Sequence, residues 1–185
     1  ITGEKGFLGY HLTQYYKWIK EYEVIELGRD YLNNIKLLKD CDLLIHCAGV
    51  NRGENIYNKN VKLAIDLVDS LQNNNIKIDI KYTSSTQVDN NTPYGKAKQY
   101  SSNILEKYCS QSSTKFESYE IPNIFGPFGK PNYNSFINTF CYNLVNNIDI
   151  THNNNLVTLC YVYDVIKSMD SNVNFNTITI SVSDI

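Results

Sequence analysis

The chain has 185 residues, which is the usual size of one domain and enough to bury a hydrophobic core. Its formal net charge is -2 and charged residues make up 19% of the sequence, so no basic surface indicates nucleic-acid binding. No apolar run is long enough to cross a bilayer and no signal-peptide pattern is present, so we expect a cytoplasmic protein without a membrane partner.

The cysteines and histidines do not form a metal-binding pattern. The five cysteines are widely spaced, and no Cys-x-x-Cys pair indicates a disulfide framework or a zinc site. The histidines His11, His46 and His152 are far apart, and His46 lies in an apolar run that is typical of a buried core residue. We therefore expect no metal site.

A glycine-rich stretch opens the chain. Residues 3–9 have the spacing Gly-x-x-Gly-x-x-Gly and precede an amphipathic segment at residues 12–19. Such a loop lets the backbone turn tightly and approach a pyrophosphate, which then lies on the N–H groups of the helix start. The candidate cofactor contacts here are Gly3, Lys5, Gly6, Phe7, Leu8 and Gly9.

Only Ile1 and Thr2 precede this loop, although the first strand of such a fold is central and buried. We therefore expect the sequence to be a fragment that lacks most of that strand.

We predict the second strand at residues 23–27, and it ends at Gly28-Arg29-Asp30. In dinucleotide folds an acidic residue at this point binds the ribose 2′-hydroxyl, whereas an arginine accommodates a 2′-phosphate. Both residue types are present. Arg29 comes first and favours NADP, Asp30 leaves NAD possible, and an ordinary polar turn is the alternative interpretation.

Two further apolar strands are predicted at residues 42–47 and 76–82, separated by a helix with apolar spacing at residues 61–71. The first strand runs into Ala48 and Gly49, whose small side chains leave room for a cofactor. The second strand places a cluster of hydroxyl groups, residues 83–86, at the carboxyl edge of the sheet, where ligands bind in open α/β folds.

Tyr94 and Lys98 lie one turn apart on the helix that follows, which begins near Pro93. The lysine charge predicts a lowered pKa for the Tyr94 phenol, which would then exchange a proton near neutral pH. An isolated Tyr-x-x-x-Lys is more often a solvated helix face. The upstream hydroxyl cluster and the glycine-rich loop favour the functional interpretation here.

The rest of the chain continues to alternate strands and helices. We predict a fifth strand at residues 116–121, a helix at 136–145, a strand at 156–159, a helix start at 161–165 and a strand at 177–182. The predicted fold is α/β, a Rossmann-type doubly wound parallel sheet. We assign residues 1–126 to an NAD(P)-binding domain and residues 127–185 to a small, incomplete substrate subdomain.

Several motifs together carry a family resemblance. These are Gly3-x-x-Gly6-x-x-Gly9, Ser84-Ser85, Tyr94-x-x-x-Lys98, Asn123-x-x-Gly126-Pro127 and Tyr161-Val162-x-Asp164. In this order they resemble the extended short-chain dehydrogenase/reductases, the NAD-dependent epimerase/dehydratase group that acts on nucleotide sugars.

The resemblance implies catalytic roles for Ser85, Tyr94 and Lys98. Ser85 would hydrogen-bond the substrate oxygen, Tyr94 would transfer the proton, and Lys98 would bind the nicotinamide ribose. A homodimer is also implied. Candidate substrate contacts are Asn51, Arg52, Ser84, Gln87, Asn123, Lys130, Asn132 and Asn134. For the last four, turn chemistry and helix capping are the alternative roles.

Residues 48–52, Pro122-Asn123 and residues 130–135 resemble one branch of this family more closely. Members of that branch reduce a UDP-linked 4-keto-6-deoxy N-acetylhexosamine with NADPH for capsular polysaccharide synthesis, and a zinc cupin domain follows their reductase domain. No cupin is present in these residues. Two features depart from the family pattern: the strand before Pro122 lacks the usual arginine, and residues 30–42 form a short connection.

Other functions remain alternatives. Family dehydratases carry an Asp-Glu pair where this chain has Thr86 and Gln87, neither of which is a general acid or base, so dehydration is disfavoured. A nucleotide-sugar epimerase with retained NAD is the enzymatic alternative. A non-catalytic dinucleotide sensor is the other alternative, which the intact Tyr-x-x-x-Lys motif disfavours.

Overall fold

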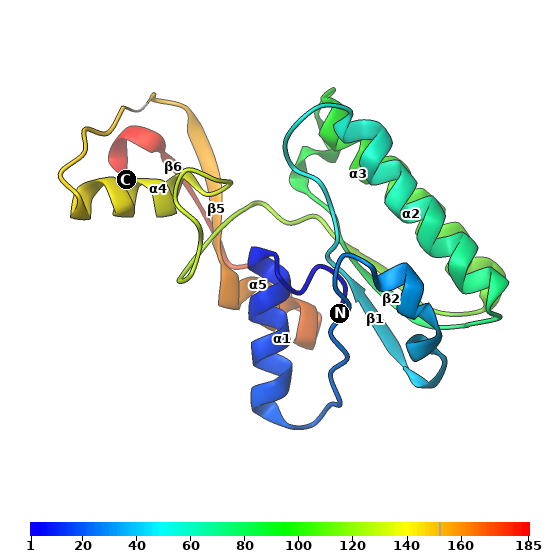
Figure 1. The fold of residues 1–185 in the computed structure, drawn as a ribbon. Coiled ribbons are helices and arrows are strands. Elements are labelled where there is room, and N and C mark those ends of the chain that lie inside the picture. The colour runs from blue at the N-terminus through cyan, green and yellow to red at the C-terminus, as the bar shows by residue number, and fades with distance from the viewer. Residues whose placement is uncertain (152) are drawn as a thin grey trace. The chain divides into compact units, whose positions relative to one another are not determined.

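The computed structural model describes residues 1–151 and 153–185, and these form two compact units, Ile1–Glu120 and Ile121–Ile185 (Figure 1). Each unit is described by itself. His152, one of the three histidines considered above, lies outside the described residues. Within those residues, no helix combines the length and the apolar character that crossing a bilayer requires.

The first unit is built on a parallel sheet with the strand order β1 (Leu43–His46), β2 (Asp79–Thr83) and β3 (Phe116–Tyr119). Thr2 extends this order on the β1 side, because it forms parallel bridges both to His46 and to Leu27. Leu27, which comes next in the chain, therefore lies on one side of Thr2, and β1, which comes later, lies on the other side. This is the doubly wound arrangement that the sequence predicts.

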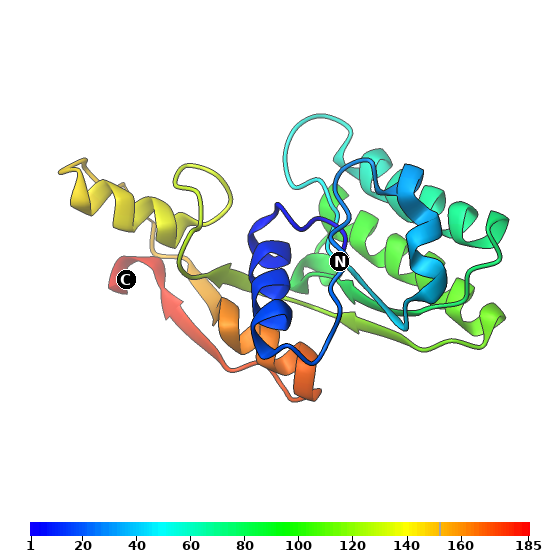
Figure 2. The same ribbon diagram turned by 60° about the horizontal axis from the view of Figure 1, so that its bottom comes forward.

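Helices cover both faces of this sheet. Figure 1 and Figure 2 show α2 (Ile56–Asn73) and α3 (Pro93–Ser112) side by side on one face, and α1 (Phe7–Ile19) on the other. The 3₁₀-helical segment Tyr31–Asp40 lies beside α2, and the Tyr31 hydroxyl donates to the backbone oxygen of Leu63 over 3.4 Å.

The core of this unit lies between the sheet and the α2–α3 layer. Apolar side chains from both layers meet there because β1 and β2 are covered and α2 presents an apolar stripe to them. The most buried members include Leu44, Leu67, Leu71, Ile78, Ile80 and Leu105.

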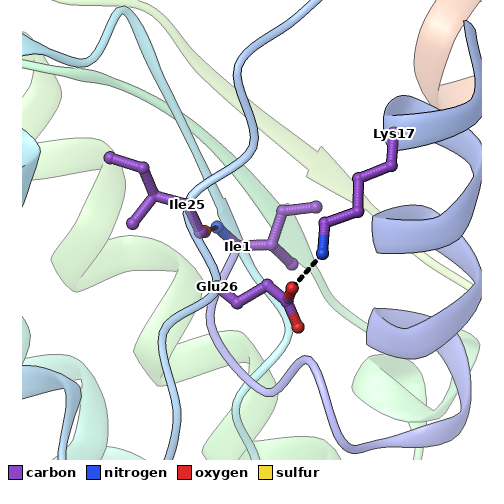
Figure 3. Close-up of polar contacts among 4 residues, drawn as sticks. All are labelled: Ile1, Lys17, Ile25 and Glu26. Carbon is purple, nitrogen blue, oxygen red and sulfur yellow. Dashed lines mark hydrogen bonds and ion pairs between the residues drawn. The ribbon is translucent and has the colours of Figure 1, made fainter. Parts of the chain in front are cut away.

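Two segments of the first unit differ from expectation. The strand predicted at residues 23–27 is reduced to one bridge, between Leu27 and Thr2. Figure 3 shows the contacts that hold this segment: the Ile1 amino group donates to the Ile25 oxygen over 2.7 Å, and Lys17 of α1 forms an ion pair with Glu26. The segment Tyr31–Asp40, expected to be a plain connection, forms 3₁₀ turns that bury Tyr31, Ile35 and Leu38.

The second unit contains β4 (Asn123–Phe125), β5 (Leu156–Tyr161) and β6 (Thr177–Ser181), with α4 (Phe136–Val145) and α5 (Val162–Ser171). The β4 and β5 strands pair in parallel, and β6 pairs antiparallel with β5. No strand was predicted at β4, and β6 was predicted as a strand at residues 177–182 but within a parallel sheet. β6 is largely exposed, which an antiparallel edge strand tolerates. The buried residues of this unit include Leu159, Cys160, Val162, Val165, Ile166 and Met169.

Candidate active site

The glycine-rich loop packs against the carboxyl end of β1. A Cβ added to Gly3, whose φ is +68°, would lie 2.9 Å from the Ala48 nitrogen, and a Cβ added to Gly9 would lie 2.2 Å from the Gly3 oxygen. Neither position has room for a side chain. Gly6 donates its N–H to the Gly3 oxygen over 2.8 Å and brings no capping side chain to α1. The first N–H groups of α1 therefore face outward for an anion, which fits the pyrophosphate of a dinucleotide.

The loop also lies at the topological switch point of the sheet. Thr2 donates its N–H to the Ile45 oxygen over 3.0 Å, while Leu27 on the other side donates to the Ile1 oxygen over 2.9 Å. The connections that leave these neighbours run to opposite faces. In open α/β sheets, ligands bind in the crevice at the carboxyl ends of the strands at such a point.

The helix α3 starts with local contacts that hold it against the turn that follows the hydroxyl cluster. Thr92 caps the helix by accepting the Gly95 N–H over 3.0 Å. A Cβ added to Gly95 would lie 2.0 Å from the Gln87 oxygen, so the 3₁₀ turn Thr86–Asp89 packs directly on the helix. The Ser85 hydroxyl caps that turn by accepting the Gln87 N–H over 3.2 Å. Because the oxygen is the acceptor there, the hydroxyl hydrogen is left to be donated to a ligand.

Lys98 connects these parts. Its side chain is 4% exposed, and its Nζ donates to the backbone oxygen of Thr83 over 2.7 Å. The same Nζ lies 5.8 Å from the centroid of the Tyr94 ring and 4.8 Å from that of Tyr82. Burial lowers the pKa of Lys98 to about 8 because the charged form loses its hydration.

The prediction that Tyr94 has a lowered pKa is wrong. The phenol is half-buried, and burial raises its pKa above the ordinary value. The short hydrogen bond of the Lys98 ammonium goes to the Thr83 oxygen, and the cause of the Tyr94 shift is the loss of hydration of the phenolate on burial. Tyr94 is therefore a protonated phenol at neutral pH.

The end of β1 links Lys98 to the glycine-rich loop. A Cβ added to Gly49 would lie 3.5 Å from the Lys98 Nζ and 3.3 Å from the Asn60 Oδ1. The glycine-rich loop packs on Ala48, the residue before Gly49. The loop and Lys98 therefore both adjoin the short segment Ala48-Gly49.

Asn60 is a site residue that the sequence did not reveal. It is 4% exposed, and its side chain accepts the Val50 N–H over 2.9 Å and donates to the Val50 oxygen over 2.8 Å. This pair of hydrogen bonds fixes the path of the backbone beyond Gly49. The only available signal was a single polar residue adjoining the apolar stripe of the predicted helix.

The other candidate ligand contacts in the first unit differ in how far they are exposed to solvent. Ser84 is buried with Thr83 at the end of β2. Phe7 and Leu8 are half-buried at the start of α1. The exposed candidates are Lys5, Gly6, Arg29, Asn51, Arg52 and Gln87. Their roles as ligand contacts stay predictions.

The four substrate candidates of the second unit are all exposed. The Asn123 side chain donates to the Thr158 oxygen over 3.3 Å, and the Asn132 backbone N–H donates to the Thr139 hydroxyl over 2.8 Å. Asn132 also has a φ of +56°, as turn asparagines often do. Lys130 and Asn134 lie in the same connection. Turn chemistry and substrate contact therefore both remain open for these residues.

His46 is a satisfied core residue, as predicted. It is 1% exposed, its Nδ1 shares a hydrogen bond of 2.8 Å with the Thr2 hydroxyl, and its ring stacks on Tyr82. Burial lowers its pKa to about 3, so the ring is neutral. Within the described residues, no group of three or more metal-binding side chains is placed to hold an ion.

Comparison with known proteins agrees with this geometry. The model of the NAD dependent epimerase/dehydratase family matches residues 1–174. The chain belongs to this family. The predicted membership of the extended short-chain dehydrogenase/reductases is thereby confirmed, and with it the α/β fold class and the NAD(P)-binding character of the family.

Two proteins that resemble this chain have names that indicate a function: one is named as a reductase and the other as a capsular polysaccharide assembling protein. A UDP-2-acetamido-2,6-beta-L-arabino-hexul-4-ose reductase from Pseudomonas aeruginosa is 31% identical over 175 residues, which cover 91% of this chain and 47% of the reductase. The crystal structure of the capsular polysaccharide assembling protein CapF from Staphylococcus aureus is 29% identical, with a TM-score of 0.84 over 99% of this chain and 54% of CapF. The chain spans about half the length of these relatives.

A more distant relative shares the fold. UDP-glucose 4-epimerase from Thermotoga maritima is 16% identical and has a TM-score of 0.81 over 98% of this chain and 78% of the epimerase. The likeness extends to enzymes of different activity, so the fold alone does not select the reaction.

Proposed function

We propose that the protein reduces the 4-keto group of a UDP-linked 6-deoxy N-acetylhexosamine in surface polysaccharide biosynthesis, and that NADPH is the favoured reductant. The observation that carries this proposal is the placement of Lys98 between the Thr83 oxygen, the Tyr94 ring and the Gly49 backbone, next to the glycine-rich loop. The name and 31% identity of the Pseudomonas aeruginosa reductase support the substrate class.

The cofactor would be held by the glycine-rich loop and by the small residues Ala48 and Gly49, where side chains would otherwise fill the cradle. Bound there, it would supply the hydride to the ketone carbon. Arg29, exposed just beyond the second extended segment, would pair with the 2′-phosphate of NADPH. Asp30 next to it would favour the 2′-hydroxyl of NADH.

The residues of the chain handle the proton. The Ser85 hydroxyl would donate a hydrogen bond to the carbonyl oxygen and hold it in place. The Tyr94 phenol, which burial keeps protonated, would deliver its proton to that oxygen as negative charge develops. Lys98 would then stabilise the phenolate through its charge and contact the nicotinamide ribose. A protonated phenol suits reduction, because the reaction consumes a proton.

We assign cofactor binding to the first unit and sugar-nucleotide contacts to Asn51, Arg52, Ser84 and Gln87 of that unit and to residues 127–185. Since the chain spans about half of its relatives, the activity is proposed for the whole protein. For that protein we also propose a homodimer and a following cupin domain.

Replacing Tyr94 by phenylalanine in the whole protein tests this assignment. The rate of NADPH oxidation with the UDP-linked 4-keto sugar should fall at least about 100-fold, because the general acid is lost, while NADPH binding is kept. Tyr100→Phe is the matched control, since Tyr100 lies on the same helix with 49% of its surface exposed. Unchanged NADPH oxidation in Tyr94→Phe would contradict the proposal.

A further inference from the structure

The second residue of the glycine-rich loop is a glutamate that is largely buried as a residue. Glu4 is 7% exposed, and its Oε1 lies 3.6 Å from the position that a Cβ on Gly28 would occupy. Within the described part of the chain, no hydrogen bond or ion pair is found for this carboxylate. Since no side chain or backbone group of the described residues is found to hold these oxygens, they are available to accept a hydrogen bond from a ligand.

Gly28 is the first residue of the turn that reads the adenosine ribose in dinucleotide folds. It follows Leu27 directly, and the Glu4 carboxylate lies beside it, at ordinary contact distance from where a side chain would begin. The placement is fixed on both sides. Leu27 donates its N–H to the Ile1 oxygen over 2.9 Å, and Tyr31 donates to the Gly28 oxygen over 3.1 Å. The ion pair between Lys17 and Glu26 ties the preceding residues to α1 (Figure 3).

We infer that Glu4 is a specificity-determining residue for the dinucleotide. Its carboxylate accepts a hydrogen bond from the 2′-hydroxyl of the adenosine ribose and repels a 2′-phosphate at the same place. Glu4 therefore opposes Arg29, and the balance of the two charges sets how strongly the site discriminates between NADPH and NADH. The inference rests on the proposed function for the assignment of a dinucleotide to this loop.

Binding measurements on the whole protein test the inference without relying on sugar reduction. Dissociation constants for NADPH and NADH are measured by fluorescence titration for the parent protein and for Glu4→Gln. The substitution keeps the shape of the side chain and removes the charge. We expect the preference for NADPH over NADH to rise about tenfold, because the repulsion of the 2′-phosphate is lost. Adenosine 2′,5′-bisphosphate against adenosine 5′-monophosphate, as smaller probes, should show the same change in ratio.

Glu106→Gln is the control, because Glu106 is an exposed carboxylate on α3. It should leave the ratio unchanged. Glu4→Ala provides a second variant, and its thermal melting shows that the fold is kept. If the ratio of the NADPH and NADH dissociation constants is unchanged in folded Glu4 variants, this inference alone is overturned. Equal weakening of the binding of both dinucleotides would have the same consequence. A parent protein that binds neither dinucleotide would overturn the proposed function and this inference together.

Discussion

At the scale of single residues, burial moves Tyr94 and Lys98 in opposite directions. It raises the pKa of the phenol and lowers the pKa of the ammonium to about 8, because each group loses hydration of its charged form. The phenol therefore stays protonated at neutral pH. The pKa of the lysine comes close to neutral pH, so that a small rise in pH removes its charge. In the proposed reaction, the charged ammonium would stabilise the phenolate that forms when Tyr94 gives its proton to the ketone oxygen.

This arrangement predicts the pH dependence of kcat/KM for ketone reduction. The Lys98 ammonium is charged below pH 8 and loses its proton above it, while Tyr94 stays protonated through that range. kcat/KM should therefore be level below pH 8 and fall about tenfold per pH unit above it. The arginine of the Lys98→Arg variant stays charged throughout this pH range. Any activity that the variant retains should therefore not decline above pH 8.

A profile that stays level from about pH 6 to about pH 10 would contradict the assignment of Lys98. The measurement uses initial rates at low substrate concentration, since kcat/KM reports the ionisation of the free enzyme.

The pairing of Tyr94 with Lys98 could be predicted from the sequence, because a spacing of four residues on a helix fixes which side chains share a face. The sign of the Tyr94 pKa shift could not. It depends on how deeply β2 and the turn Thr86–Asp89 bury the phenol, and the sequence does not state these long-range contacts. Asn60 was missed for the same reason, since its partner Val50 is ten residues away in a loop.

At the scale of elements, the contact between α3 and the turn Thr86–Asp89 places the hydroxyl of Ser85, the residue proposed to bind the ketone oxygen. Gly95 makes the close approach possible, because a larger residue would meet the Gln87 backbone. Ser85 begins this turn and caps it, so the position of its hydroxyl depends on the turn keeping its place on the helix.

Gly95→Ala tests this dependence. The added methyl group would force the turn away from α3, and we expect a loss of stability on the order of 1–3 kcal/mol. Urea unfolding of the whole protein measures the change. Lys96→Ala, at the exposed neighbouring position of the same helix, should stay close to the parent. Equal stability of Gly95→Ala and the parent would show that the turn and the helix are not in contact.

Elements with strong internal periodicity could be predicted well. The helix expected at residues 136–145 has these same bounds as α4, and the helix at residues 61–71 lies within the longer α2. Residues 23–27 were wrongly predicted as a strand, because pairing is a property of two segments, and the pairing found here in the described residues is the Thr2–Leu27 bridge. The 3₁₀ segment Tyr31–Asp40 was missed because its short turns carry no sustained period.

At the scale of the whole molecule, the order of strands around Thr2 puts the glycine-rich loop at the switch point of the sheet. The connections on either side of Thr2 run to opposite faces of the sheet, and ligands bind at such a point in open α/β folds. The doubly wound order followed from the alternation of strands and helices in the sequence. The choice between reduction and epimerisation does not follow from the fold, because the family contains enzymes of both kinds with the same framework.

Transfer of deuterium from the cofactor to the sugar tests the central claim most directly. The whole protein is incubated with the UDP-linked 4-keto sugar and NADPH deuterated at the hydride position, and the product is examined by mass spectrometry and NMR. The account predicts one deuterium on the former ketone carbon of each product molecule, with one NADPH oxidised per turnover. An epimerised sugar without deuterium, formed with no net oxidation of NADPH, would contradict it.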